Sequence, residues 1–128
     1  MAVLTTCTAE KSIAPGRIPA RSRYRGARIE EAAALAQAQE LPLLFLSGVY
    51  GIVRSSHPLP WYDHALQAHE VEAMVPRVSA QLATLRLGAV LALMCPVQTP
   101  GWPPYHRLLA AACQEAGVSL ALQWTQRC

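Results

Sequence analysis

The chain has 128 residues, of which 52 % are hydrophobic and 15 % are charged, and its formal net charge is +3. This length suits one domain with one core, and the composition excludes a disordered chain. No apolar run reaches the roughly 18 residues of a membrane helix. Residues 1–4 lead into the first polar residues without the basic segment of a signal peptide. We therefore expect a cytoplasmic protein with no membrane partner.

The first half of the chain predicts two strands around one helix. Residues 3–6 are typical of a short buried strand, and residues 11–26 form a loop rich in Pro, Gly and Arg. Residues 27–39 carry Ala, Leu, Glu and Gln in a helical pattern that ends at Leu41-Pro42. The continuous apolar run of residues 43–46 predicts a strand that is covered on both faces.

The second half begins with a long irregular segment, residues 47–63. Loops of this length inside compact domains often carry function. A helix is predicted over residues 66–85, where Pro76 should introduce a kink or divide it into two helices. The remaining elements are a strand at 89–94, a Pro-rich loop at 95–104, a helix at 103–116 capped by Gly117, and a closing strand at 118–124.

Strands that alternate with helices predict an α/β fold. We expect a single domain over residues 1–128, with a single-layer, mostly parallel four-stranded sheet and helices on both faces. In such sheets ligands lie beyond the C-terminal ends of the strands. The loops at 7–26, 47–63 and 95–104 leave that edge and hold most of the prolines, many aromatic residues and a basic cluster. The sequence therefore predicts a cleft at this edge.

The basic cluster lies in the first of these loops. It has no acidic residue inside it and consists of Lys11, Arg17, Arg21, Arg23, Arg25 and Arg28. Such clustering indicates an anionic partner, such as a nucleic acid, a nucleotide or phosphate. A solvated, flexible basic loop is the alternative interpretation.

The first loop also carries chemically active side chains directly after a strand. The hydroxyl of Thr8 and nearby backbone N–H groups can hold a phosphate or carboxylate, with Lys11 supplying charge. Alternatively, Cys7 is a nucleophile activated by the basic loop. The third interpretation is a buried thiol at a strand end beside a surface lysine.

Ser47-Gly48-Val49-Tyr50-Gly51 is the sharpest local signal. Two glycines three residues apart after a buried strand predict a tight turn and a close approach of the backbone to another group. The segment is not a nucleophile elbow, which needs G-x-S-x-G. It also lacks the G-x-G-x-x-G and Walker A patterns.

Residues 58–63 form a rigid aromatic segment that ends in a carboxylate. Trp61 and Tyr62 can stack on a base or a sugar. Asp63 can bind ribose hydroxyls or act as a general base. The alternative role for Asp63 is the N-cap of the following helix.

The histidines and cysteines form no metal-binding motif, so we predict no metal and no organic cofactor. The cysteines have no C-x-x-C spacing, and in a reducing cytosol all four are expected to be free thiols, with Cys113 in the core. Near the third loop, Gln98, Trp102 and Tyr105 are expected to line the same cleft. Trp124 marks either a dimer edge or a contact with the last helix.

The segments 44–53 and 59–63 resemble the bacterial YaaA family of peroxide-stress proteins, and also a group of shorter bacterial and phage proteins with a related domain of unknown function. In both, a strand runs into Leu-Ser-(Gly or Ala)-x-Tyr-Gly-(Leu or Ile), and a Pro-Tyr pair follows. The shorter group shares Cys-(Ser or Thr)-x-x-Lys after the first strand, matched by Cys7, Thr8 and Lys11, and an Arg-rich approach to a Tyr, matched by residues 21–24. This chain departs from the pattern by placing Trp61 between the Pro and the Tyr.

The resemblance implies a nucleoside or nucleic-acid pocket at the strand end, together with a link to oxidative stress and DNA binding. Three functions stay open: an enzyme acting on a nucleobase or an N-glycosidic bond, a non-catalytic DNA- or RNA-binding protein of the stress response, and a partner-binding domain. The enzyme hypothesis assigns catalysis to Asp63, Lys11 and Ser47, and ligand binding to Cys7, Thr8, Arg21, Tyr24, Gly48, Tyr50, Gly51 and Tyr62. The substrate and the oligomeric state are left open.

Overall fold

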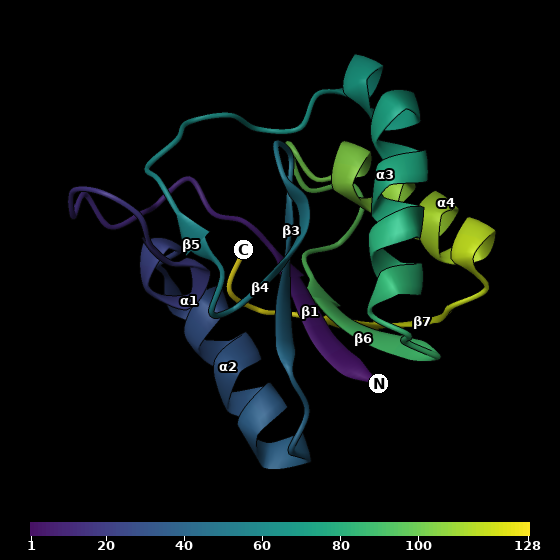
Figure 1. The fold of residues 1–128 in the computed structure, drawn as a ribbon, viewed down its shortest axis with the longest axis horizontal. Helices are drawn as coiled ribbons and strands as arrows, with labels where there is room; N and C mark the ends of the chain where they lie inside the picture. Colours follow the sequence, from purple (N-terminus) through teal and green to yellow (C-terminus); the bar gives the residue numbers. More distant parts are fainter.

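A mixed five-stranded sheet runs through the centre of the computed structural model, which describes residues 1–128 (Figure 1). The strand order is β4-β3-β1-β6-β7. The strands are β1 (Ala2–Thr6), β3 (Leu43–Ser47), β4 (Gly51–Arg54), β6 (Ala89–Met94) and β7 (Ser119–Trp124). Four of them are parallel, and β4 runs antiparallel to β3 at one edge.

The predicted α/β fold with a mostly parallel sheet is confirmed, but the predicted number of four strands is wrong. The four parallel strands lie within about two residues of their predicted bounds. The additional strand, β4, falls inside the segment that was expected to be irregular. It has only four residues, begins with a glycine and ends with an exposed arginine, so it carries little of the usual strand pattern.

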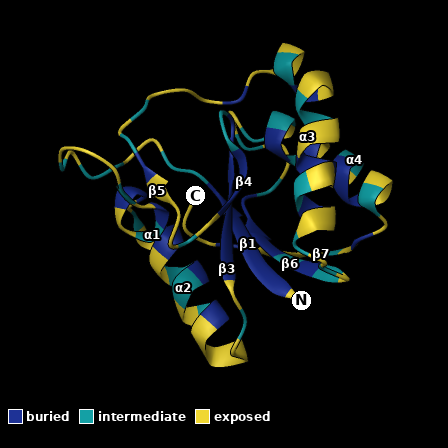
Figure 2. Cartoon of the chain, viewed as in Figure 1, coloured by how far each residue is buried: buried dark blue, intermediate teal, exposed yellow.

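Helices cover both faces of the sheet. On one face, α2 (Ala27–Gln39) packs Ile29, Ala32 and Ala36 against β1 and β3. On the other face, α3 (Val71–Thr84) and α4 (Pro103–Ala116) pack together over a larger core. Figure 2 shows β1 and β3 buried between these layers along their whole length. None of these helices combines the length and the apolar character that crossing a membrane requires.

The predicted division into two helices at Pro76 is wrong, and a kink at Pro76 stays a prediction. A 3-10 turn, η1 (Ala68–Glu70), leads directly into α3, and α3 continues through Pro76. Pro76 lies in the second turn of α3, on the exposed side of the helix, where the bulk of its ring faces solvent. The helix predicted at 103–116 is confirmed, and Gly117 ends it with φ +71°.

The basic loop is ordered around one buried arginine. The loop forms a two-stranded sheet of β2 (Ile18–Pro19) with β5 (Pro58–Leu59), followed by a single turn, α1 (Ala20–Arg23). The guanidinium of Arg23 is fully buried. It donates to the backbone carbonyls of Ser12, Ala14, Gly16 and Leu59. For this residue, the alternatives of a free anion-binding cation and a solvated loop are both wrong, because its donors organise the chain itself.

The expectation of four free thiols is also wrong, since Cys95 and Cys128 form a disulfide with a Cα–Cα distance of 5.7 Å. After β7 the chain turns back over the end of β6, where the Thr125 N–H donates to Met94 C=O and its hydroxyl donates to Glu31. This path brings together two cysteines separated by 33 residues, a pairing with no local signature. Cys7 and Cys113 are free, and Cys113 is buried as predicted.

Replacing Arg23 by Met should lower the free energy of unfolding by about 3 kcal/mol, because the Leu59 carbonyl would be buried without a donor and residues 12–16 would lose the contacts that order them. Urea denaturation measures this change. The exposed Arg17→Met is the matched control and should change stability by less than about 0.5 kcal/mol. Equal effects of the two substitutions would contradict a structural role for Arg23.

Candidate functional site

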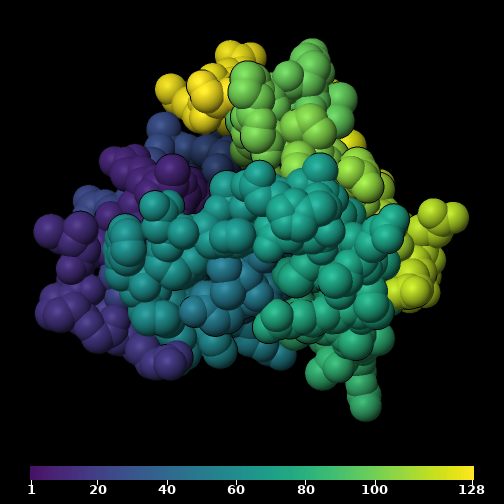
Figure 3. All heavy atoms as spheres, turned by 90° about the horizontal axis from the view of Figure 1, so that it is seen from above, coloured from purple at the N-terminus to yellow at the C-terminus, as the bar shows by residue number.

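The loops that follow β1, β3 and β6 meet at one edge of the molecule. Figure 3 looks onto this edge, with the first loop in purple, the segment after β5 in teal and the third loop in green. The chain passes from β1 to β3 on one side and later to β6 on the other, so β1 lies at a topological switch point. Ligand sites of open α/β sheets form at such points.

Two adjoining cavities lie at this edge, and we call them together the strand-end cleft. The smaller has a volume of about 70 Å³ and the larger of about 270 Å³. Both cavities are lined by Cys7, Thr8, Ala9, Ala65 and Tyr105. Lys11, Asp63 and His64 complete the smaller cavity, whereas Thr6, Arg28, Pro100, Gly101 and Trp102 complete the larger.

Tyr105 connects the first loop to the segment that precedes α3, because its hydroxyl contacts both. Its hydroxyl accepts the Leu66 N–H at 3.0 Å and lies 3.4 Å from the Cys7 sulfur. Burial raises the pKa of the Tyr105 phenol above its ordinary range, so it stays protonated and can donate to the sulfur. The expectation that Trp102 and Tyr105 line the cleft is confirmed, whereas Gln98 lies outside it.

Lys11 places an amine in the smaller cavity. Its ammonium donates to Thr8 C=O and lies 4.7 Å from the centre of the Tyr62 ring. Burial lowers the pKa of Lys11, while the charges of Cys7 and Asp63 act in the opposite direction. The ion pairs of this chain are Arg21–Glu30 and His64–Glu70, so no carboxylate lies within ion-pair distance of Lys11. The amine therefore retains donors that can reach a ligand.

Arg28 is a second cation of the cleft, and its only role predicted from the sequence was membership of the basic cluster. Its guanidinium donates to the Thr5 hydroxyl at 2.6 Å, to Thr6 C=O at 3.0 Å and to Cys7 C=O at 3.3 Å. It also stacks on the Trp102 ring at 4.8 Å. Burial lowers the pKa of Arg28 to about 10, which leaves it charged at neutral pH. In the sequence, Arg28 differs from the rest of the basic cluster because it alone lies in the helix predicted over residues 27–39.

The backbone of the first loop adds further donors. Thr8 and Ala9 line both cavities, and their N–H groups donate to no other group of the protein. Lys11 lines one of these cavities and Arg28 lines the other. The unpaired ammonium of Lys11 and the two open N–H groups, with the charge of Arg28 beside them, are the chemistry of an anion site.

Ser47 is the last residue of β3 and lines neither cavity of the cleft. Its buried oxygen accepts the N–H groups of Val49 and Tyr50, each at 3.1 Å, and lies 2.8 Å from the Tyr62 hydroxyl. Because both lone pairs of the Ser47 oxygen are occupied, its own hydrogen must point to Tyr62. The serine thus holds the turn between β3 and β4.

The phenols of Tyr24 and Tyr62 continue this network, since their hydroxyls are hydrogen-bonded to each other. Burial raises the pKa of both phenols above the ordinary range. Each therefore keeps its hydrogen, and one of the two hydrogens occupies the bond between them. Lys11 lies over both rings, and the ring of Tyr50 packs edge-on against Tyr62 at 5.3 Å.

The predicted close approach at the two glycines is confirmed, and its partners are parts of the protein. A Cβ at Gly48 would lie 2.8 Å from the Leu66 nitrogen, and a Cβ at Gly51 would meet the Gln81 side chain. Gly51 also has φ +71°, a conformation that favours glycine. The Gln81 amide bonds the backbone of Tyr50 and Ile52 on either side of Gly51.

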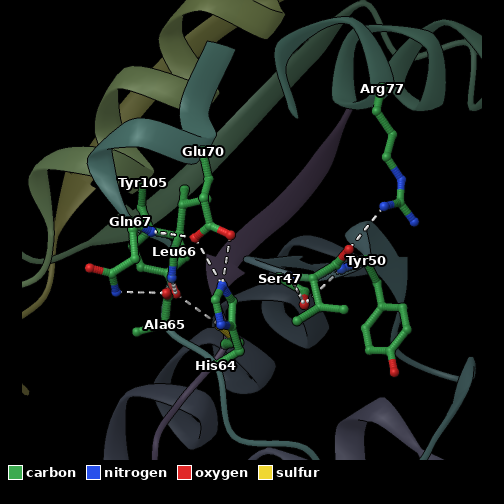
Figure 4. A network of polar contacts seen from close by, with 11 residues as sticks. Ser47, Tyr50, His64, Ala65, Leu66, Gln67, Glu70, Arg77 and Tyr105 are labelled. Atoms are coloured by element: carbon green, nitrogen blue, oxygen red, sulfur yellow. Dashed lines mark hydrogen bonds and ion pairs between the residues drawn. The ribbon is translucent and has the colours of Figure 1, made fainter. Parts of the chain in front are cut away.

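Asp63 is exposed at the rim of the smaller cavity, and its alternative role as a helix N-cap is wrong. The helix begins later, at Ala68, where Gln67 and Glu70 form a capping box. Figure 4 shows His64 beneath the Glu70 carboxylate. The distance from His64 Nε2 to Glu70 Oε1 is 2.8 Å. The pKa of Glu70 is lowered mainly by the hydrogen bond that its carboxylate accepts from Gln67 N–H, and to a smaller extent by the hydrogen bond with His64. Asp63 is left without such a partner.

The remaining predicted ligand residue, Arg21, lies outside the cleft and pairs with Glu30 at 2.9 Å. Trp61 is exposed and lines neither cavity. No cluster of three or more His, Cys, Asp or Glu side chains is placed to hold a metal ion. Compared with known proteins, the chain matches no family model, no curated sequence and no solved structure.

Stability should fall as pH rises above about 10, the ordinary tyrosine pKa. Since burial raises the pKa of Tyr24, Tyr62 and Tyr105, the folded state keeps protons that the unfolded chain has already released. The unfolded state then binds fewer protons, and the free energy of unfolding decreases with pH. Urea titrations at a series of pH values measure the slope. Tyr62→Phe should make it shallower, and an unchanged slope in this variant would contradict the raised pKa.

Proposed function

We propose that the strand-end cleft binds a small anion that contains a nucleobase, such as a nucleotide. The observation that carries this proposal is the ammonium of Lys11, which faces the cleft without a carboxylate partner. An unpaired, partly buried cation is costly unless something compensates it. A phosphate can accept from Lys11 and from the open N–H groups of Thr8 and Ala9.

The larger cavity supplies the surface for the flat part of the ligand. Its wall includes the Trp102 and Tyr105 rings, and Arg28 is held there by the end of β1. Aromatic side chains stack on any nucleobase, because every base has a flat π-face. The resemblance to the shorter bacterial and phage proteins, which includes Cys7, Thr8 and Lys11, supports the same class of ligand.

We extend the proposal to an enzyme acting at the nucleobase or at its N-glycosidic bond. Asp63 shares the smaller cavity with Lys11, and no helix cap or ion pair occupies its carboxylate. It can serve as a general base or stabilise positive charge on the sugar. Ser47 is assigned a positioning role in this scheme, because its oxygen is already saturated.

Non-catalytic nucleic-acid binding has narrower support. Arg17 and Arg25 are exposed, but Arg23 is committed to the loop and Arg21 to Glu30. Within the basic cluster, few cations therefore remain to follow a phosphate backbone. Such binding would weaken steeply with salt, because each neutralised phosphate releases counterions.

Lys11→Gln should abolish the thermal stabilisation that the best nucleotide of a panel gives to the wild-type protein. A ligand at 100 times its dissociation constant stabilises by about 2.7 kcal/mol, which thermal-shift measurements resolve. Arg17→Gln is the control, since Arg17 is exposed and outside the cleft, and it should retain the shift. A shift that survives in Lys11→Gln, or that appears only with oligonucleotides at low salt, would contradict a nucleotide cleft.

Asp63→Asn should remove turnover of nucleosides or modified DNA while ligand binding persists, because the amide keeps the shape of the carboxylate but cannot take a proton. Product release is followed by chromatography of the free base. Glu72→Gln, which alters an exposed carboxylate on α3, is the control and should keep full activity. Equal activity of Asp63→Asn and the wild type would exclude catalysis by Asp63 but would leave the proposed ligand binding untouched.

A further inference from the structure

The two edge strands of the sheet, β4 and β7, differ in how their outward backbone groups are covered. At β4 the Gln81 side chain bonds Tyr50 C=O and Ile52 N–H, as a neighbouring strand would, and the strand ends in the exposed Arg54. At the other edge, β7 has no neighbour beyond β6. Open edges invite pairing with other chains, and proteins usually block them with charges, prolines or bulges.

None of those blocking devices is present on β7. Residues 118–126 contain no charged side chain, no proline and no glycine. Six consecutive residues of β7 pair in an unbroken register with β6, from Ser119 opposite Ala89 to Trp124 opposite Met94. The strand is therefore regular along its length and uncharged.

The hydrogen bonds identify the backbone groups that face outward. Ser119 N–H donates to Gly88 C=O, and Thr125 N–H donates to Met94 C=O. In a parallel pair, alternate residues direct both backbone groups to the same neighbour. Residues 119, 121, 123 and 125 thus face β6. The N–H and C=O groups of Leu120, Leu122 and Trp124 point to the open edge.

The same residues place large apolar side chains beside that edge. Leu122 is 43 % exposed and Trp124 is 52 % exposed, which is unusual for side chains of this size. Trp124 lies 5.8 Å from His106 of α4, so these side chains stand on the face that carries α4. The tail beyond Trp124 turns inward to Glu31 and Cys95 and leaves the edge open.

We propose that β7 pairs antiparallel with β7 of a second copy of this chain, across a two-fold axis at Leu122. The pattern is self-complementary, as an isologous interface requires. Leu122 faces Leu122 of the second copy, and Leu120 faces Trp124 of the second copy. Each such pair exchanges two backbone hydrogen bonds, so the pairing uses the outward groups of all three residues. The uncharged strand brings no like charges together.

The paired sheets form one continuous ten-stranded sheet, twice the five strands of one copy. Because the two β7 strands run in opposite directions, the two strand-end clefts lie at opposite edges of this sheet. Dimer formation therefore does not depend on the proposed ligand, and ligand binding does not depend on the dimer.

Sedimentation equilibrium at a series of concentrations tests the proposal. The wild type should reach twice the chain mass of 13.9 kDa. Leu122→Lys should be monomeric, because two ammonium groups would meet on the two-fold axis. Val97→Lys is the control, since Val97 is 50 % exposed and lies outside β7, and it should still dimerise. A wild type that stays monomeric, or a Leu122→Lys variant that dimerises, would overturn the proposal.

A cross-link gives an independent readout that does not rely on loss of association. In Leu122→Cys, the two thiols would face each other at a Cα separation of about 5.5 Å, which suits a disulfide. Mild oxidation should yield a covalent dimer on non-reducing gels, whereas Val97→Cys should not. The absence of this product in Leu122→Cys would contradict the antiparallel register.

Discussion

The candidate site depends on the hydrogen bonds that the buried guanidinium of Arg28 donates to the end of β1. A charge removed from water is costly unless every donor finds a strong acceptor. Here the acceptors are the Thr5 hydroxyl and the carbonyls of Thr6 and Cys7, so the cation fixes the last residues of β1 to the first turn of α2. The path of the chain beyond β1 follows from this, as does the direction in which Cys7 and Thr8 enter the cleft.

A second set of contacts fixes the opposite wall. Tyr105 of α4 holds the Leu66 N–H and reaches the Cys7 sulfur. Leu66 in turn packs on Gly48, whose lack of a side chain permits the backbone to approach, and Ser47 closes the same turn. The Ser-Gly-x-Tyr-Gly motif therefore acts as scaffolding. It brings the segment with Tyr62 and Asp63 over the first loop, while Lys11 and Asp63 remain free to meet a ligand.

The three long helices, the parallel strands and the edge at which Cys7, Lys11 and Asp63 meet could be predicted from the sequence, since long apolar runs and loop composition are local signals. The strand β4 could not, because a four-residue edge strand needs little apolar pattern, and neither could the Cys95–Cys128 bond, because that contact exists only after the chain has folded. Arg23 and Arg28 looked like a cationic surface. Their burial depends on carbonyl groups that only the folded backbone presents.

Amide chemical-shift mapping during titration with a nucleoside monophosphate tests the central claim, an anion site at the strand-end cleft, most directly. The largest shifts should fall on Thr8 and Ala9, whose N–H groups are open, and on residues 63–65 across the cleft. A separate cavity, of about 460 Å³, lies between β4 and α3 and is lined by Arg54 and Arg77. Shifts confined to that cavity, or to the exposed Arg17 and Arg25, would contradict the claim.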